Sequence, residues 1–132
     1  MSEAEVHRAL LYLEKVVEEH HVLVERLENL VVLDTPNEEE VLDVLKRLRS
    51  KRKEIYENFK AIVDNLEHVT YRPTREEALG IINYYYAVML PDEKRALEAI
   101  PAKVNLGHLR DEVQKDLAMI DKIRNLITRF VY

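Results

Sequence analysis

The chain has 132 residues with 20 Lys or Arg and 25 Asp or Glu, which gives a formal net charge of -5 at pH 7. It has no cysteine, which excludes disulfides and thiolate–metal sites. Only two glycines against 34% charged residues favour helices over strands, and the length predicts one domain with a single core. High Lys, Glu and Arg content is typical of proteins from hyperthermophiles.

Two long helices are expected first, over residues 3–32 and 36–68. In both, apolar residues recur at alternating steps of four and three, the period of helices that pack along a seam. Each begins with a Ser/Thr-x-x-Glu capping box, in which the hydroxyl of Ser2 or Thr35 accepts from a free backbone N–H. Because their connection is short, the helices should form an antiparallel hairpin over residues 3–68.

A third capping box at Thr74 predicts a helix over about 75–90, which is apolar on nearly every face after Ala78 and should therefore be surrounded. Pro91 is expected to end this helix. The apolar run is about 13 residues long, whereas a bilayer span needs about 20, so no membrane span is predicted. Charged residues close to the N-terminus also exclude a signal-peptide pattern.

Two further helices are expected after the proline. A short one over about 92–100 should stop before Pro101, and a last one, capped by Asn105, should cover about 105–131. The predicted fold class is all-α. It is a helix bundle made of the long antiparallel hairpin and two or three further helices, in one domain spanning residues 1–132.

The segment KRLRSKRK carries six cations in eight positions of an acidic chain. Those cations are Lys46, Arg47, Arg49, Lys51, Arg52 and Lys53. At about 100° per residue, they surround the second helix instead of lining one of its faces. Arg52 falls on the apolar seam itself, so the partner of its guanidinium is the contact that says most about this segment.

Pairing within the chain is one interpretation of these charges. Asp43 lies four residues before Arg47, which is the spacing of a helical ion pair. In an antiparallel hairpin that turns near residue 34, Glu18 and Glu19 face the region of Lys51. Exposed pairs of this kind contribute about 0–1 kcal/mol each.

Contact with the phosphates of nucleic acid is the other interpretation, with Lys60 added to the six cations. If about six phosphates were neutralised, a plot of the logarithm of the binding constant against the logarithm of the salt concentration would have a slope of about -5. Such binding would not depend on base sequence, because no element resembles a recognition helix. The acidic net charge argues against a diffusive search along DNA.

Glu18, His21 and Glu25 lie on one helical face and form half of the motif of a di-iron bundle. The chain has no second Glu-x-x-His segment to complete that motif, although His108 and Asp111 could approach it in the fold. It also lacks a glycine-rich phosphate loop and a nucleophile elbow. We therefore expect neither an enzyme nor a metal or other cofactor.

Three consecutive tyrosines, Tyr84, Tyr85 and Tyr86, point in three directions from a helix, and each hydroxyl needs a partner. A subunit interface supplies such partners readily, and tyrosine is enriched there. The C-terminal residues Phe130 and Tyr132 are also apolar or aromatic. We assign these five residues to a predicted contact between subunits, with core packing as the alternative for the tyrosines.

A small, cysteine-free helical chain with a long hairpin and a basic band in mid-helix resembles the major coat proteins of filamentous archaeal viruses. The resemblance implies subunits that package double-stranded DNA and assemble with copies of themselves, or with a related subunit, into a helical filament. It assigns the phosphate contacts to the basic segment and Lys60, and it implies a location in the virion.

The competing hypothesis is a cytoplasmic helical bundle that binds another protein or regulates it, without nucleic acid. In that case the basic segment is an ordinary solvated surface, and the tyrosine helix contacts the partner.

Overall fold

The computed structural model of the chain describes residues 2–104 and 107–132. These residues are almost entirely helical and contain no strand, which confirms the all-α prediction. The long helices are α1 (Ser2–Val31), α2 (Glu38–Asn65), α3 (Arg72–Tyr84), α4 (Leu90–Lys103) and α5 (Gly107–Ile127). A π-helical segment, η2 (Tyr85–Met89), joins α3 to α4, and the short 3-10 helices are η1 (Leu66–His68) and η3 (Thr128–Phe130).

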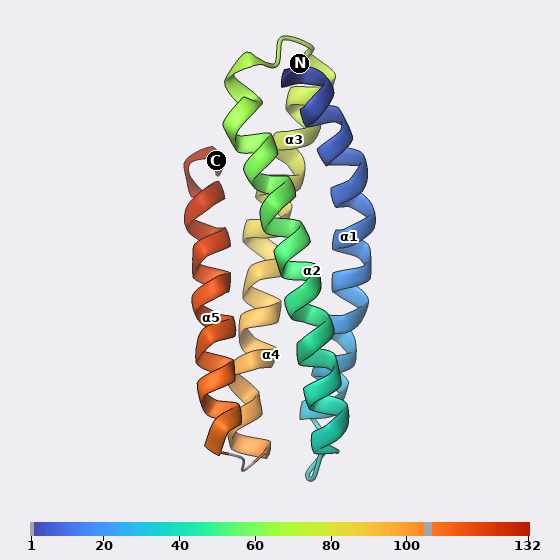
Figure 1. Cartoon of the computed structure of the whole chain (residues 1–132), viewed down its shortest axis with the longest axis vertical. Coiled ribbons are helices and arrows are strands. Elements are labelled where there is room, and N and C mark those ends of the chain that lie inside the picture. The colour runs from blue at the N-terminus through green and yellow to red at the C-terminus, as the bar shows by residue number, and fades with distance from the viewer. Residues whose placement is uncertain (1, 105–106) are drawn as a thin grey trace.

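The helices form a bundle of four parallel or antiparallel rods, because α3, η2 and α4 lie end to end as one rod (Figure 1). The α1–α2 hairpin is present as predicted. Helix α1 packs against α2 and α4, and α5 packs against the same two helices from the other side. Consequently α2 and α5 are neighbours that run in the same direction, with a continuous face between them (Figure 1).

The start of α2 differs from the predicted capping box. Asn37, not Thr35, is the N-cap, and its side chain accepts a hydrogen bond from the backbone N–H of Glu40 at 3.1 Å. Asn37 has the extended backbone that an N-cap requires, and three glutamates fill the first turn, where the helix dipole favours negative charge. The helix therefore begins at Glu38, after Pro36.

Pro91 does not end the third helix, contrary to the prediction. The N–H of Leu90 donates to the carbonyl of Tyr85, five residues earlier, so the helix widens into a π-helical turn just before the proline. A proline has no N–H and clashes with the carbonyl four residues before it in a regular α-helix. The wider turn removes that conflict, and the rod continues into α4.

Other predicted boundaries also shift. Helix α3 starts at Arg72, before Thr74, with Pro73 in its first turn, and α4 runs through Pro101 to Lys103. Pro73 lies in the first turn, where its missing N–H costs nothing, whereas Pro101 lies in the last turn and α4 ends two residues after it. The last helix turns into η3 after Ile127. The predicted cap of α5 lies outside the described residues.

Apolar side chains from all the rods fill the centre of the bundle, in the seams that the four-three period predicted. Four polar or charged side chains of the described part of the chain are buried with them: His20, Arg52, Glu93 and Asp116. Among the described residues, no helix is long and apolar enough to cross a membrane.

Candidate functional site

Arg52 lies in the middle of the core and is only 1% exposed. Its Nε donates to Oε2 of Glu93 on α4 at 2.9 Å, and its Nη1 donates to Oδ1 of Asp116 on α5 at 2.7 Å. The guanidinium thus joins α2 to α4 and to α5. The backbone of a duplex lying on the surface cannot reach an arginine buried this deeply, so its predicted role in DNA binding is wrong.

His20 of α1 completes the buried network. Its Nε2 lies 3.0 Å from the same Oε2 of Glu93 that accepts from Arg52. The Tyr85 ring lies beside it, with its centroid 6.1 Å from the imidazole and 5.1 Å from the ring of Phe59. All four rods therefore contribute a side chain to the network or to its aromatic wall.

Burial by itself raises the pKa of Glu93, but the adjacent His20 and Arg52 outweigh it and lower the pKa to about 2. Burial lowers the pKa of Arg52, but the carboxylates of Glu93 and Asp116 outweigh it and raise that pKa overall. Glu93 and Arg52 therefore stay charged in the folded protein. Burial also raises the pKa of Tyr85 well above its usual value, so its hydroxyl keeps its proton.

In the described part of the chain, some hydrogen-bonding groups around the buried network have no partner. Four of its buried polar atoms have no hydrogen-bond partner among the described residues: His20 Nδ1, Arg52 Nη2, Tyr85 Oη and Glu93 Oε1. Buried polar atoms of this kind are uncommon in folded proteins, and each costs free energy. Arg52 is also one of the residues that line a surface hollow.

Arg49 connects the network to the surface between α2 and α5. Its guanidinium donates twice to Asp116, at 2.8 and 3.0 Å, and lies 3.5 Å from Oε2 of Glu112. The paired Asp116 carboxylate raises the pKa of Arg49. Above these residues lies a hollow of about 440 Å³, lined by Arg49, Arg52, Lys53, Glu112, Lys115, Asp116 and Met119.

Much of the basic segment is neutralised within the chain. Lys51 pairs with Glu19 across the hairpin, as predicted, and Arg47 pairs with Asp43 four residues earlier, also as predicted. Lys60 pairs with Asp64, but both side chains are more than half exposed. Lys46 and Lys53 are exposed, and neither forms an ion pair with any residue that the structure describes.

The fold adds cations to this face that we did not assign to it from the sequence. Lys115 lines the same hollow as Lys53, which the sequence had already assigned, and the Nζ of Lys122 lies 4.7 Å from the centroid of the Tyr56 ring of α2. These contacts place the exposed row of α5 beside that of α2. The basic face is defined here by six exposed residues: Lys46, Lys53 and Lys60 from the α2 side, and Lys115, Lys122 and Arg129 from the α5 side.

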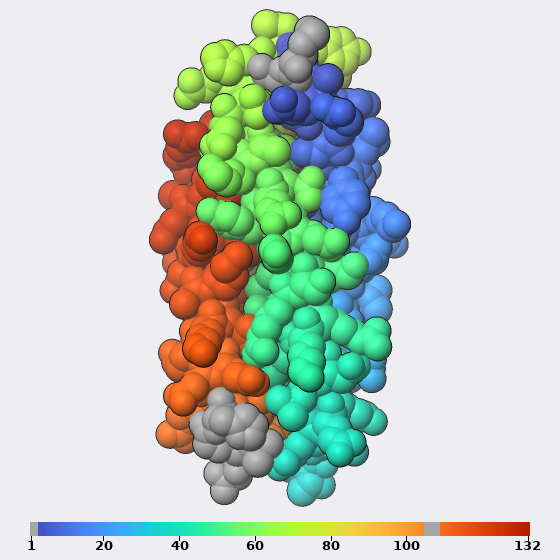
Figure 2. All heavy atoms as spheres, in the orientation of Figure 1, coloured from blue at the N-terminus to red at the C-terminus, as the bar shows by residue number. Residues whose placement is uncertain are grey.

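Both rows have a spacing of seven residues, which returns a helix to nearly the same face after two turns. The signal was therefore present in the sequence, but only the packing of α2 against α5 shows that the two rows meet. Figure 2 shows the two helices side by side and facing the viewer.

The predicted interface residues separate into two groups. Tyr85 is fully buried in the chain's own core, so its assignment to a subunit contact is wrong. The register of η2 turns it inward. Tyr84 is 51% exposed and Tyr132 is 90% exposed, so both remain available to a partner. Asn83 fixes the extended C-terminal residues in place. Its side chain donates a hydrogen bond to the carbonyl of Phe130 and accepts one from the N–H of Tyr132.

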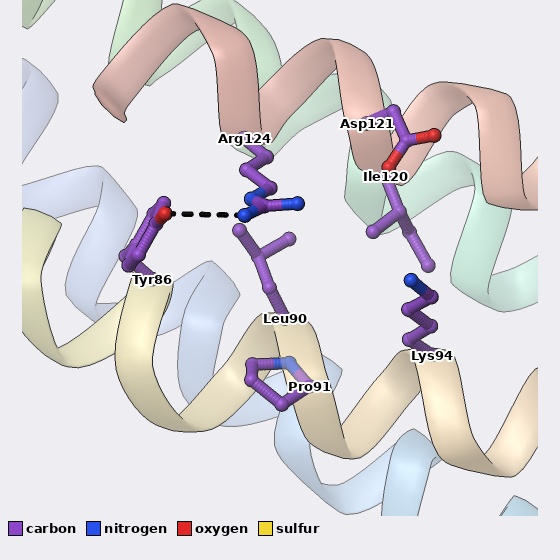
Figure 3. Close-up of a pocket in the computed structure, with 7 residues that line it drawn as sticks. All are labelled: Tyr86, Leu90, Pro91, Lys94, Ile120, Asp121 and Arg124. Carbon is purple, nitrogen blue, oxygen red and sulfur yellow. Dashed lines mark hydrogen bonds between the residues drawn. The ribbon is translucent and has the colours of Figure 1, made fainter. Parts of the chain in front are cut away.

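Tyr86 forms one wall of a smaller pocket between η2, α4 and α5 (Figure 3). Its hydroxyl accepts a hydrogen bond from Nη2 of Arg124 at 3.4 Å, which lowers the pKa of the tyrosine. Leu90, Pro91 and Ile120 make the pocket largely apolar, and its volume is about 270 Å³. Tyr86 is therefore occupied by a contact within the chain.

The residues of the half motif for metal binding lie on α1. His21 Nε2 lies 3.0 Å from Glu25 Oε1, with both side chains exposed. Among the described residues, no group of three His, Asp or Glu side chains is placed to hold a metal ion.

Comparisons of the chain with protein-family models, with curated proteins and with solved structures found no match.

Proposed function

We propose that this chain binds a phosphate-bearing polyanion, specifically double-stranded DNA, through the basic face between α2 and α5. The observation that carries the proposal is the pair of cation rows at seven-residue spacing, which the fold places side by side. Arg52 and Arg49 are not part of this contact. They belong to the ion-paired network beneath it.

The register between the helices spaces the cations evenly. Arg49 pairs with Asp116, and Tyr56 contacts Lys122, so Lys53 lies about midway between Lys115 and Lys122 along the bundle. Cations in one row are separated by about 10 Å, at about 1.5 Å per residue. Interleaved rows therefore offer a charge about every 5 Å, within the reach of flexible lysines to successive phosphates.

The lysines of the basic face would recognise the charge of a nucleic acid and not its base sequence. A lysine is a flexible point charge, and its contacts with phosphates carry no information about the bases. The rest of the chain is acidic, so a bound polyanion would be repelled from the other faces and held in one orientation. The proposed contact is therefore independent of base sequence and oriented by charge.

Assembly into a filament, as the resemblance to viral coat proteins implies, is the extended form of this proposal. Of the predicted interface residues, Tyr84 and Tyr132 are exposed and would contact a neighbouring copy. Electron microscopy of the protein with and without duplex DNA tests this part separately. Filaments support a coat protein, and discrete particles restrict the proposal to DNA binding.

The competing function, binding of a protein partner, is favoured by the exposed apolar tip of the α1–α2 hairpin. Val32 is 74% exposed and Leu33 is 51% exposed, and Val32 also lines a hollow of about 200 Å³ together with Asp92 and Arg95 of α4. An apolar tip of this kind contributes nothing to phosphate binding.

Fluorescence anisotropy with a labelled random duplex distinguishes the two functions. The proposal predicts binding at about 20 mM salt, with a log–log salt slope of about -4.5 to -5.5 for five or six phosphate contacts. Absence of binding at that salt concentration, with the bundle folded by circular dichroism, eliminates the DNA proposal and leaves the protein-partner function.

A further inference from the structure

We infer that the hollow between α2 and α5 is a binding site for a single phosphate group, either free or at the end of a small phosphorylated molecule. This goes beyond the proposed function, because a small anion needs only the hollow and not the full length of the basic face. The site is built by the four cations and two carboxylates that line the hollow, with Met119 as an apolar wall.

Arg52 carries a hydrogen-bond donor that has no partner among the described residues. This side chain is 99% buried and lines the hollow, and its Nη2 has no partner among the described residues. A guanidinium donor left unpaired in a core is costly, whereas a hydrogen bond between two charged groups is among the stronger ones in proteins. An oxyanion in the floor of the hollow would supply the missing acceptor.

The residues in and behind the hollow carry an excess of positive charge. Arg49, Arg52, Lys53 and Lys115 face three carboxylates, those of Asp116 and Glu112 and of Glu93 behind Arg52. One positive charge is therefore left without compensation. A single phosphate group would neutralise it.

The carboxylate of Glu112 is only weakly bound by its arginine partner. Glu112 Oε2 is 3.5 Å from Arg49 Nη2, beyond a good hydrogen bond, and its side chain is 37% exposed. Asp116, in contrast, is held by two arginines and is buried. An arriving phosphate would displace Glu112 toward solvent and take its place beside Arg49, which opens the way to the floor.

The volume of the hollow, about 440 Å³, exceeds what inorganic phosphate needs and falls within the usual range of small-molecule sites. Met119 offers an apolar contact for the organic part of a phosphorylated ligand. The phosphate group is the shared chemistry, and inorganic phosphate alone is a sufficient probe of the anchor.

Calorimetric titration of the full chain with sodium phosphate, with sodium chloride at equal ionic strength as the reference, tests the inference. The double variant K53Q/K115Q should bind phosphate at least about tenfold more weakly, since each lost charged contact is worth about a factor of ten. The matched control K46Q/K60Q removes the same charge outside the hollow and should bind as the original chain does.

A variant with the opposite effect excludes a general charge effect. E112Q removes the competing carboxylate without touching the buried network, and it should bind phosphate more tightly by several-fold. In NMR spectra, the guanidinium signals of Arg52 should shift on addition of phosphate. A structural role of these residues alone would change neither affinity nor these signals.

Equal loss of phosphate binding in K53Q/K115Q and K46Q/K60Q overturns the site, as does absence of binding to the original chain. The DNA proposal fails in a different way. DNA binding without phosphate binding overturns only the hollow, and phosphate binding without DNA binding overturns only the polyanion proposal.

Discussion

Arg52 and Glu93 form a hydrogen-bonded ion pair at the centre of the bundle, with 2.9 Å between Nε and Oε2 and both side chains almost fully buried. The two residues are 41 positions apart and come from rods that α1 and α5 separate. Together with His20 and Asp116, the pair fixes how the rods are registered against one another. The stability of the bundle should therefore depend on it more than on any surface ion pair.

Removal of the Arg52 charge tests this dependence. R52M keeps the apolar length of the side chain but leaves Glu93 buried without its arginine and Asp116 paired with Arg49 alone, so we expect a loss of about 3–5 kcal/mol in the free energy of unfolding. R47M is the matched control, because Arg47 and its partner are exposed, and it should cost about 0–1 kcal/mol. Urea denaturation measures both. Equal effects of the two variants would contradict a central role for Arg52.

Acid should weaken the bundle through Glu93. Its pKa of about 2 in the folded chain lies below the ordinary value of 4.5, so the folded state binds this proton less readily than the unfolded state. The stabilisation is therefore complete above about pH 4.5 and is lost as the pH falls toward 2, with a total of about 3 kcal/mol.

E93Q cannot take up that proton, which makes it the control for the acid effect. The free energy of unfolding of E93Q should change less between about pH 5 and pH 2.5 than that of the original chain. Parallel curves for the two proteins would show that Glu93 is not the group responsible.

The hydroxyl of Tyr85 is predicted to be dispensable. It is buried and has no hydrogen-bond partner among the described residues, so Y85F removes an unpaired polar atom while keeping the ring that packs on Phe59. We expect a gain of up to about 1 kcal/mol in the free energy of unfolding. Y84F, at an exposed position, should have no effect. A clear loss of stability in Y85F would reveal a partner for the hydroxyl.

Gly80 offers a simple stabilising change. It lies inside α3, its backbone is ordinary for a helix, and a Cβ at this position would meet nothing within 4 Å. G80A should therefore add about 0.5–1 kcal/mol, because alanine loses less conformational freedom than glycine in a helix. A rise in Tm by calorimetry would confirm it, and a fall would indicate a close neighbour at that face.

Local patterns in the sequence were sufficient for the fold class and the hairpin. The four-three period identified both long helices, and the pairing of Lys51 with Glu19 follows from the antiparallel register alone. The prolines misled the prediction, because a π-helical turn before Pro91 and a helix end after Pro101 accommodate them. That solution depends on tertiary packing, which periodicity does not contain.

The candidate site was only half predictable. Arg52 stood out because it interrupts an apolar seam, but its partners Glu93 and Asp116 are 41 and 64 positions away. The pairing of Arg52 with these two carboxylates depends on which rods lie near α2. In the same way, the seven-residue spacing of Lys115 and Lys122 became meaningful only once α5 was placed beside α2.

The most direct test of the account is DNA binding by two triple variants with equal loss of charge. K53Q/K115Q/K122Q removes cations from the basic face, and R8Q/K15Q/R26Q removes exposed cations from α1, outside that face. In anisotropy titrations with a random duplex at about 50 mM salt, the account predicts that only the first variant loses affinity, by at least about a hundredfold. It also predicts a salt slope reduced by about 3 for that variant alone. Equal affinities of the two variants would contradict it.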